Sequence, residues 1–376
     1  MNLKILSISV LVLAVLSGIV AWINRPAAPA NADPRVGTSL LENIDVNAAT
    51  AFTVANNDDS VALARDESGA WSVESYHGLP ADEDKLRRLM QDLNEANLAR
   101  VVTRNPERAA RLNLGEASVA VTAGDTHRIV FGQSASRGGR YVKLAEADDA
   151  PVYLTPATTF IDALPKNWAK SDLTSFDPAD IQAVTLTLED GSTVDVHRET
   201  VEATWTAKNT PEGKQLRLQP ITSLLTSFNS LRFTNTAEPS ATDVVDAAAA
   251  ARAFTLTTFD GETLHLKLGR RPEETVVKSE PENPVDAIAD LTSGADSAPE
   301  TAEEALEDLT ETIPAGPVFA FIEGPAQLAP LAKFTRTLAF EVSSYSFTSL
   351  PTDADAIWED APISDTQIDG PIPATE

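Results

Sequence analysis

The sequence contains one local pattern twice, and this repetition restricts the fold more than any other feature. A strand-like run with a tryptophan, a proline-marked turn and an amphipathic helix follow one another from Gly69 to Leu93, and again from Ala203 to Phe228. In both copies the apolar residues of the helix recur at i, i+3, i+4 and i+7, which places them on one face. A pattern repeated in this way predicts one structural unit that occurs twice.

Runs of alternating apolar and polar residues surround each helix and predict antiparallel strands. Turn residues separate these runs, as at Asp190-Gly191, a dipeptide typical of a hairpin. We therefore predict an α+β fold, in which an antiparallel-sheet-plus-helix unit is duplicated in tandem. Two unrelated α+β domains with similar hairpins are the alternative. Matched positions disfavour that alternative: Trp71 with Trp205, Gly132 with Gly269, Lys143 with Lys278, and Pro151 with Pro317.

An apolar segment precedes the repeats. The 19 residues from Ile5 to Ile23 carry no charge, and a helix of that length spans about 28 Å, close to the hydrocarbon thickness of a bilayer. We predict a transmembrane anchor over residues 1–24, in contact with the bilayer through residues 5–23. A cleaved signal sequence is the alternative, because small residues at Ala28 and Ala30, or at Ala30 and Ala32, fit a cleavage site, although the apolar run is longer than usual. The short N-terminal tail favours a cytoplasmic N-terminus.

Composition divides the remaining chain. Residues 25–45 are rich in Pro, Ala and Asn and predict a linker. The first unit is expected over residues 46–172 and the second over residues 173–350. Within the second, residues 279–316 contain many acidic residues, several prolines and no Lys or Arg, which predicts a disordered insertion. The acidic tail over residues 351–376 is predicted to be disordered as well. The run PATTFIDAL, from Pro156 to Leu164, is expected to close the first unit as a short helix.

Charge and cysteine content exclude several classes of protein. The net charge of −27 disfavours nucleic acid and anionic lipid surfaces as partners, because both need clustered Lys and Arg. The chain has no cysteine, which excludes disulfides, Cys-ligated zinc and thiol nucleophiles. Such a chain suits an oxidising compartment.

The sequence contains no motif that carries chemistry. Phosphate-binding, dinucleotide-binding, zinc-protease and nucleophile-elbow patterns do not occur. The four histidines are not spaced as metal ligands on one element. We therefore predict no catalytic residue, no cofactor, no metal site and no enzymatic activity. A hydrolase with an unrecognised carboxylate pair is the weakest of the alternatives.

Two basic segments stand out on this acidic chain. Arginines within and just after the first helix form a candidate partner contact, and their alternative role is an ordinary solvated helix face. The loop Arg137, Gly138, Gly139 and Arg140 is a candidate anion-binding loop, and its alternative is a hairpin turn with solvated arginines. The candidate partner contact comprises Arg87, Arg88, Arg100, Arg104, Arg108 and Arg111.

The order of these segments resembles a known family. An anchor followed by GAWSV, LPADEDKLRRLMQDLNEANLARVV, RLNLGEASVAVTAG, VFG, RYVKL and PVYLTPATTFIDAL is similar to the bacterial membrane-anchored proteins of the domain-of-unknown-function 4340 family. The resemblance covers about residues 50–170 and rests on structural motifs. It implies a single-pass protein that faces the periplasm, is often encoded beside ABC-transporter permeases and gliding-type auxiliary components, and has no catalytic residues.

These observations lead to one expected function and, besides the hydrolase, one alternative. We expect a non-catalytic accessory or scaffold protein, anchored in the bacterial inner membrane, with its bulk in the periplasm. Its partner would be a membrane protein complex: the permease or ATPase of an ABC-type transporter, or another auxiliary subunit. The alternative is a module that binds an envelope polysaccharide or peptide.

Overall fold

The computed structural model describes residues 33–42, 44–144, 150–157, 160–277 and 310–361. They belong to two compact units, Met1–Lys170 and Ser171–Glu376, which are described separately. Within the described ranges no helix is long and apolar enough to cross a membrane. The predicted anchor over residues 5–23 lies outside them, as do residues 279–309 of the predicted insertion and residues 362–376 of the tail.

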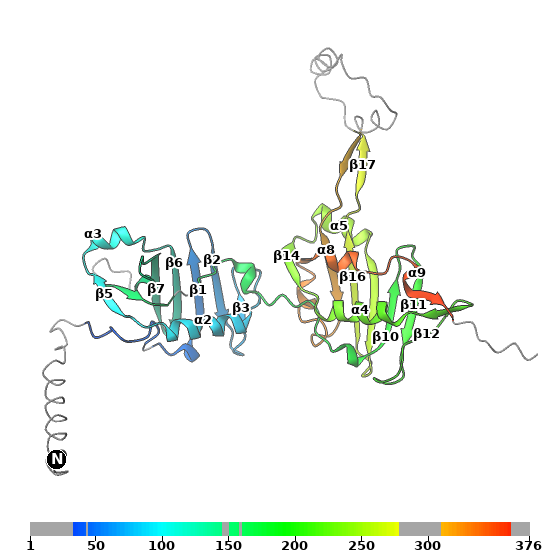
Figure 1. The fold of residues 1–376 in the computed structure, drawn as a ribbon, viewed down its shortest axis with the longest axis horizontal. Coiled ribbons are helices and arrows are strands. Elements are labelled where there is room, and N and C mark those ends of the chain that lie inside the picture. The colour runs from blue at the N-terminus through cyan, green and yellow to red at the C-terminus, as the bar shows by residue number, and fades with distance from the viewer. Residues whose placement is uncertain (1–32, 43, 145–149, 158–159, 278–309, 362–376) are drawn as a thin grey trace, which may run out of the picture. The chain divides into compact units, whose positions relative to one another are not determined.

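The first unit is built on a nine-stranded antiparallel sheet with the order β4-β3-β2-β1-β6-β7-β8-β9-β5 (Figure 1). Alternation along its strands places residues such as Phe52, Val54 and Val121 on the buried face, where none of them is exposed. The strands are β1 (Ala51–Asn56), β2 (Ser60–Arg65), β3 (Trp71–Val73), β4 (Leu79–Pro80), β5 (Arg100–Thr103), β6 (Ala117–Ala123), β7 (Asp125–Ser134), β8 (Arg140–Lys143) and β9 (Val152–Thr155).

One amphipathic helix, α2 (Glu83–Glu95), supplies much of the remaining core of this unit. The side chain of Asp82 accepts a hydrogen bond from the Lys85 amide and so caps the helix. Leu86, Leu89 and Leu93 are buried, and each stabilises the unit by about 1.5–3 kcal/mol. The shorter helical segments are η1 (Val46–Ala48), α3 (Pro106–Ala109), η2 (Ala110–Leu112) and η3 (Pro165–Trp168).

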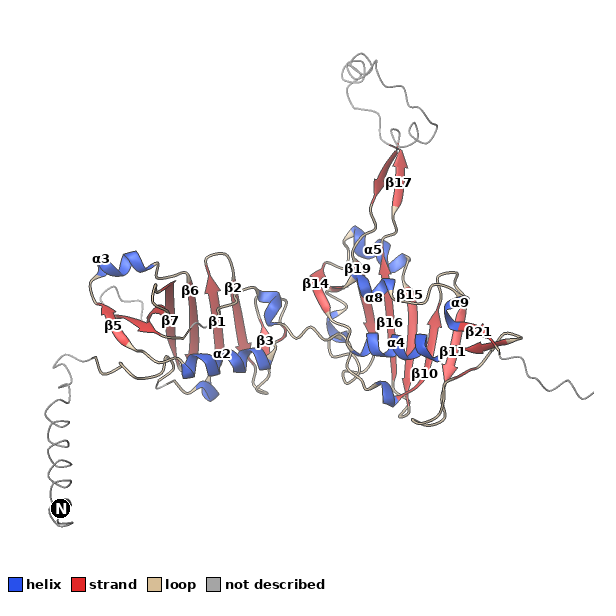
Figure 2. Cartoon of the chain, in the orientation of Figure 1, coloured by secondary structure: helices blue, strands red, loops and turns tan. Residues whose placement is uncertain are grey.

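The second unit contains an eight-stranded antiparallel sheet with the order β12-β11-β10-β15-β16-β19-β20-β14. Figure 2 shows strands predominating over helices in both units, so the predicted α+β class with antiparallel sheets is confirmed. The strands are β10 (Ile181–Thr187), β11 (Thr193–His197), β12 (Thr206–Ala207), β14 (Phe233–Ala237), β15 (Arg252–Thr258), β16 (Thr263–Arg270), β19 (Val318–Glu323) and β20 (Ala339–Val342).

Helices flank this second sheet on both faces. The helix α4 (Leu218–Asn229) buries Ile221, Leu224, Leu225 and Phe228, and Phe228 meets Phe254 of β15 edge to face at 4.9 Å. The helix α5 (Thr242–Ala249) packs Val244 and Ala247 against Phe319 and Ala339. The shorter helical segments are η4 (Pro178–Asp180), η5 (Ala332–Phe334), α8 (Ser344–Thr348) and α9 (Ala354–Ile357).

The two sheets have the same strand order, in the chain and in space. In space, the strands from β3 to β5 of the first sheet follow the same order as the strands from β12 to β14 of the second. In the chain, α2 precedes the edge strand β5 and α3 follows it, just as α4 precedes the edge strand β14 and α5 follows it. The register agrees as well: Ala117 pairs with Phe131, and Arg252 with Leu268, at the start of the matching pairs.

The segment predicted as a linker over residues 25–45 is partly folded. From Asp33 to Leu41 the chain lies beside residues 96–98, with amide-to-carbonyl hydrogen bonds from Gly37 to Leu98, from Leu98 to Thr38 and from Leu40 to Ala96. Leu40 and Leu41 are each 3% exposed. The physical reason for the difference is these two leucines, which gain free energy when they are buried. We call residues 33–41 the strap.

Parts of the predicted disordered insertion and tail are ordered. β17 (Glu274–Val277) and β18 (Thr310–Ile313) pair as a hairpin, so residues 310–313 are strand. In the tail, β21 (Trp358–Asp360) pairs with β13 (Lys214–Leu216). Ile357 and Trp358 are buried, and their burial explains why an acidic segment is ordered here.

The helix predicted over PATTFIDAL does not form in the residues described. Residues 160–164 form neither helix nor strand, and the Asp162 side chain accepts hydrogen bonds from the Leu164 amide and the Lys85 ammonium group. These bonds hold the backbone in a loop. Phe160, expected on an apolar helix face, is 85% exposed.

Candidate interaction surfaces

The six arginines of the candidate partner contact are all exposed, but the structure separates them into two groups. Arg87 and Arg88 belong to α2, which runs across the lower part of the strands in Figure 1. The other four lie on or just after the edge strand β5, near α3, which lies beyond the upper ends of the strands. We call this second group the β5 edge: Arg100, Arg104, Arg108 and Arg111.

The arginines differ in their partners. Arg87 pairs with Asp84 at 2.6 Å, and both side chains are more than two-thirds exposed, so this pair contributes little stability. Arg104 pairs with Asp33 at 2.6 Å. The side chains of Arg100, Arg108 and Arg111 have no hydrogen bond or ion pair with any residue that the structure describes. These three guanidinium groups are therefore available to a partner.

Asp33 fastens the strap to the β5 edge. Its carboxylate accepts hydrogen bonds from the Arg104 guanidinium at 2.6 Å, from the Tyr153 hydroxyl at 2.9 Å and from the Arg35 amide at 3.0 Å. Burial opposes ionisation, but these three donors outweigh it, and the pKa of Asp33 lies below its usual value. Burial, reinforced by the hydrogen bond and the negative charge of Asp33, raises the pKa of Tyr153 to about 12.

The candidate anion loop has a structural explanation. Gly138 and Gly139 adopt positive φ angles of 91° and 86° in the turn between β7 and β8, and a side chain at Gly139 would overlap the Thr155 carbonyl. Arg140 donates to the Gly132 carbonyl at 2.7 Å and lies 3.7 Å from Glu116. Turn geometry and packing therefore account for both glycines, and Arg140 already has an acidic neighbour.

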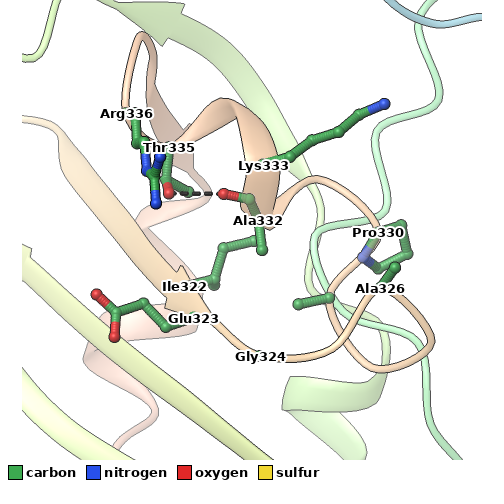
Figure 3. A pocket seen from close by; sticks show the side chains of 10 residues that line it. Ile322, Glu323, Gly324, Ala326, Pro330, Ala332, Lys333, Thr335 and Arg336 are labelled. Carbon is green, nitrogen blue, oxygen red and sulfur yellow. Dashed lines mark hydrogen bonds between the residues drawn. The ribbon is translucent and has the colours of Figure 1, made fainter.

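The second unit carries a groove that sequence reasoning did not find. A pocket of about 540 Å3 lies between the end of β19 and the loop that follows it (Figure 3). A second pocket, of about 470 Å3, extends over β15 and β16. The two pockets share Ile322, Glu323 and Thr335 in their linings, so they adjoin each other, and we call them together the groove. The loop between β19 and β20 makes its outer wall, and no local sequence signal marks such a wall.

Charged and polar groups line this groove. Figure 3 shows Glu323 and Arg336 among its side chains, while Lys333 extends away from Glu323. Thr335 donates to the Ala332 carbonyl at 2.8 Å and so fixes the turn of the loop. His265 of β16 is opposite Glu323 across the strands. The groove therefore offers hydrogen-bond donors and acceptors and contains both acidic and basic side chains, so neither sign of charge dominates.

A row of polar residues leads along the sheet into this groove. Thr185 pairs across the strands with Asp195 and with Thr255, which in turn pairs with His265. The Thr185 hydroxyl donates to Asp195 at 2.6 Å, and the hydroxyl of Thr255 lies 3.1 Å from His265 Nδ1. Among the described residues no group of three or more acidic, His or Cys residues could hold a metal ion. The row has hydrogen-bonding capacity, and no catalytic constellation follows from it.

Arg252 holds the C-terminal segment against the second sheet. It is 7% exposed, donates to the carbonyls of Pro351 and Phe347, and lies 4.5 Å from the Phe347 ring. Arg270 lies 5.3 Å from the same ring. Burial lowers the pKa of Arg252. These hydrogen bonds and the ring contact give Arg252 a structural role.

Comparison with known proteins gives one match. The family model for a domain of unknown function, DUF4340, matches residues 71–252, which include α2, β5 and the strands from β6 to β11. No curated protein and no solved structure matches the chain.

Proposed function

The chain belongs to the DUF4340 family, and from that premise we propose that it is a non-catalytic, membrane-anchored accessory or scaffold protein. Its bulk would lie in the periplasm, and its partner would be an ABC-type permease or ATPase, or another auxiliary subunit. The apolar residues 5–23 supply the anchor in this proposal.

The repeated topology is the observation that carries the proposal. We infer that the two units arose by tandem duplication, because what they share is packing. Gly132 and Gly269 occupy equivalent positions, and a methyl group at either would overlap a carbonyl oxygen of the segment packed on it. Arg65 pairs across the strands with Trp71, and in the matching hairpin Arg198 lies 4.7 Å from the Trp205 ring. A duplicated frame with different surfaces suits a scaffold.

The β5 edge supports a contact on the first unit. Arg100, Arg108 and Arg111 are exposed and without an acidic partner in the described part of the chain. The corresponding edge strand of the second unit, β14, has the sequence FTNTA and no charged residue. Guanidinium groups without partners on a chain of net charge −27 favour an anionic surface opposite.

Co-purification tests the proposal. Tagged full-length protein is extracted from native membranes in mild detergent, and the proteins that follow it are identified by mass spectrometry. We expect a stoichiometric transporter subunit. Its release by a triple substitution of Arg100, Arg108 and Arg111 by Glu would assign the β5 edge to the protein contact. Arg104 is left unchanged because it holds Asp33. The matched control is Arg87→Glu with Arg88→Glu on α2. Unchanged recovery in the triple variant would remove the β5 edge from the contact.

The groove of the second unit favours a second candidate, a module for an envelope polysaccharide or peptide. Its mixed charges and the polar row suit hydroxyl and amide groups. A ligand from a panel of such compounds would raise the Tm of the full-length protein, and Glu323→Ala would abolish that rise. If no compound of the panel raises the Tm of the wild-type protein, the ligand-binding candidate is contradicted and the scaffold proposal remains.

A further inference from the structure

The chain enters the first unit at the β5 edge. Asp33, the first residue described, is held by Arg104, one residue beyond β5, and by Tyr153 of β9. Its side chain is 7% exposed. The strap then continues beside residues 96–98, just before β5. Of all parts of this unit, the β5 edge therefore lies next to the point where the N-terminal segment joins.

The length of chain before Asp33 limits its distance from the anchor. Residues 24–32 are nine residues between the apolar run and Asp33. Even fully extended, nine residues reach about 30 Å. With the anchor of the proposed function in the bilayer, this short connection keeps Asp33 and the adjoining β5 edge within about 30 Å of the end of the anchor.

Local charge at this edge is opposite to that of the whole chain. Between Asn97 and Leu112 there are four arginines and a single acidic residue, Glu107. Arg35, in the strap, is exposed as well. The net charge of −27 predicts repulsion from an anionic surface, and that average holds for the rest of the molecule. Repulsion elsewhere and attraction here would select one orientation of the unit.

We propose that the β5 edge binds the anionic phospholipid headgroups of the bilayer that carries the anchor. The guanidinium groups of Arg100, Arg108 and Arg111 are exposed and unpaired in the described part of the chain. Their planar forks match the oxygens of a phosphodiester, which they bind through paired hydrogen bonds. This inference rests on the membrane anchor of the proposed function. It names lipid, in place of protein, as the partner of this edge.

The absence of cysteine makes a direct test available. Single cysteines replace Ala110, an exposed residue at the β5 edge, and Val245, an exposed residue of α5 in the second unit. Each full-length variant is labelled with a fluorophore and placed in vesicles that contain a headgroup-linked quencher. One set of vesicles is zwitterionic, and the other contains phosphatidylglycerol.

We expect stronger quenching at Ala110→Cys in the anionic vesicles than in the zwitterionic ones, and a return to the zwitterionic level in high salt. Replacing Arg100, Arg108 and Arg111 by Gln should remove the difference, whereas Arg87→Gln with Arg88→Gln should retain it. Val245→Cys should show no dependence on lipid charge. Equal quenching at Ala110→Cys in both lipids would overturn the inference, as would a response that the triple variant keeps.

Flotation of the same vesicles separates the two proposals. If the protein floats with both lipids but shows no charge-dependent quenching, the anchor is supported and lipid binding by the β5 edge is contradicted. Protein that does not float contradicts the anchor and, with it, this inference. Quenching that appears only when a co-purified transporter subunit is present would assign the edge to protein.

Discussion

The two units share a frame and differ at one edge. In both, a hairpin with a tryptophan, a long helix and an edge strand follow in the same order, and the last strands of the sheet are added in the same sequence. In the first unit four arginines lie on or just after the outer strand β5, and the strap lies beside the residues that precede it. In the second, β14 is uncharged, and the hairpin of β17 and β18 is inserted after β16. The two units share their packing and differ in their surfaces.

The arginine opposite the tryptophan shows how far one shared position can diverge. Arg198 is 8% exposed and donates to the carbonyls of Ile181, Val201, Pro178 and Ala179 at 2.7 to 3.0 Å. Arg65 is exposed, and its guanidinium group donates to the carbonyls of Gly69 and Asn47.

We expect Arg198→Ala to lower the free energy of unfolding by about 3–5 kcal/mol, because several buried carbonyls lose a charged donor. Arg65→Ala should lower it by about 1 kcal/mol, because water replaces the guanidinium at an exposed site. Urea denaturation followed by tryptophan fluorescence measures both. Equal effects would show that the buried network adds nothing to the second unit.

The paired glycines give the next largest effects. A methyl group at Gly269 would overlap the Ala247 carbonyl and press on Ala251, and a methyl group at Gly132 would overlap the Leu112 carbonyl. We expect Gly269→Ala and Gly132→Ala each to destabilise by about 1–3 kcal/mol, with Gly269→Ala the larger. Gly124→Asn is the control, since no atom approaches its side-chain position and Asn tolerates a positive φ, so its effect stays within about 0.5 kcal/mol. A neutral Gly132→Ala would break the equivalence of the two copies.

Much of this frame was predictable because its signals are local. The Asp190-Gly191 dipeptide predicts the hairpin of β10 and β11, in which Gly191 has a φ of 81°. The helix over residues 83–95 follows from Asp82 and its apolar spacing. Local patterns fail where order comes from distant partners: the strap is folded by residues 96–98. β21 is held by β13, about 140 residues earlier in the sequence.

The candidate site was less predictable for the same reason. The sequence marks the arginines as a group, but only the sheet separates Arg87 and Arg88 from the β5 edge. The predicted match of Pro151 with Pro317 is wrong: Pro151 precedes β9 and Pro317 precedes β19, yet β19 pairs with β16 as β8 pairs with β7. The helix α5 went unpredicted, although its alanine-rich sequence favours a helix.

A substitution of Tyr153 tests the contact between the strap and the β5 edge, which occurs in the first unit. By register its counterpart in the second unit is Phe340, so Tyr153→Phe makes the first unit resemble the second. We expect a loss of about 1–2 kcal/mol at neutral pH, because Asp33 loses a hydrogen-bond donor at a partly buried site. Denaturant titration measures it, and Tyr141→Phe is the matched control, since its hydroxyl has no hydrogen bond with the described residues.

The pH dependence of the same pair has a defined sign. Asp33 has a lowered pKa in the folded state, so its contribution is present above about pH 4 and is lost as the pH falls through that lowered value. The pKa of Tyr153 is raised to about 12, so its contribution is present below about pH 10 and is lost as the pH rises towards 12. Tyr153→Phe should therefore remove the alkaline loss. An unchanged alkaline profile would contradict the buried hydrogen bond.

The smallest effects are expected at two short helical turns that both copies share. Asp45 accepts a hydrogen bond from the Asn47 amide, and Asp177 accepts one from the Ala179 amide. Both carboxylates are exposed, and each replacement by Ala should cost about 0.5–1 kcal/mol. Similar losses would agree with an inherited turn.

The second of these turns is also bound by Arg198. The carbonyls of Pro178 and Ala179 are partners of Arg198, so the cap and the arginine stabilise one segment. We expect Asp177→Ala to destabilise less in an Arg198→Ala background than in the wild type, whereas Asp45→Ala should be additive with Arg198→Ala. A double-mutant cycle measures the difference. Full additivity at Asp177 would mean that the turn keeps its shape without the arginine, and that the equivalent turns are stabilised locally in both copies.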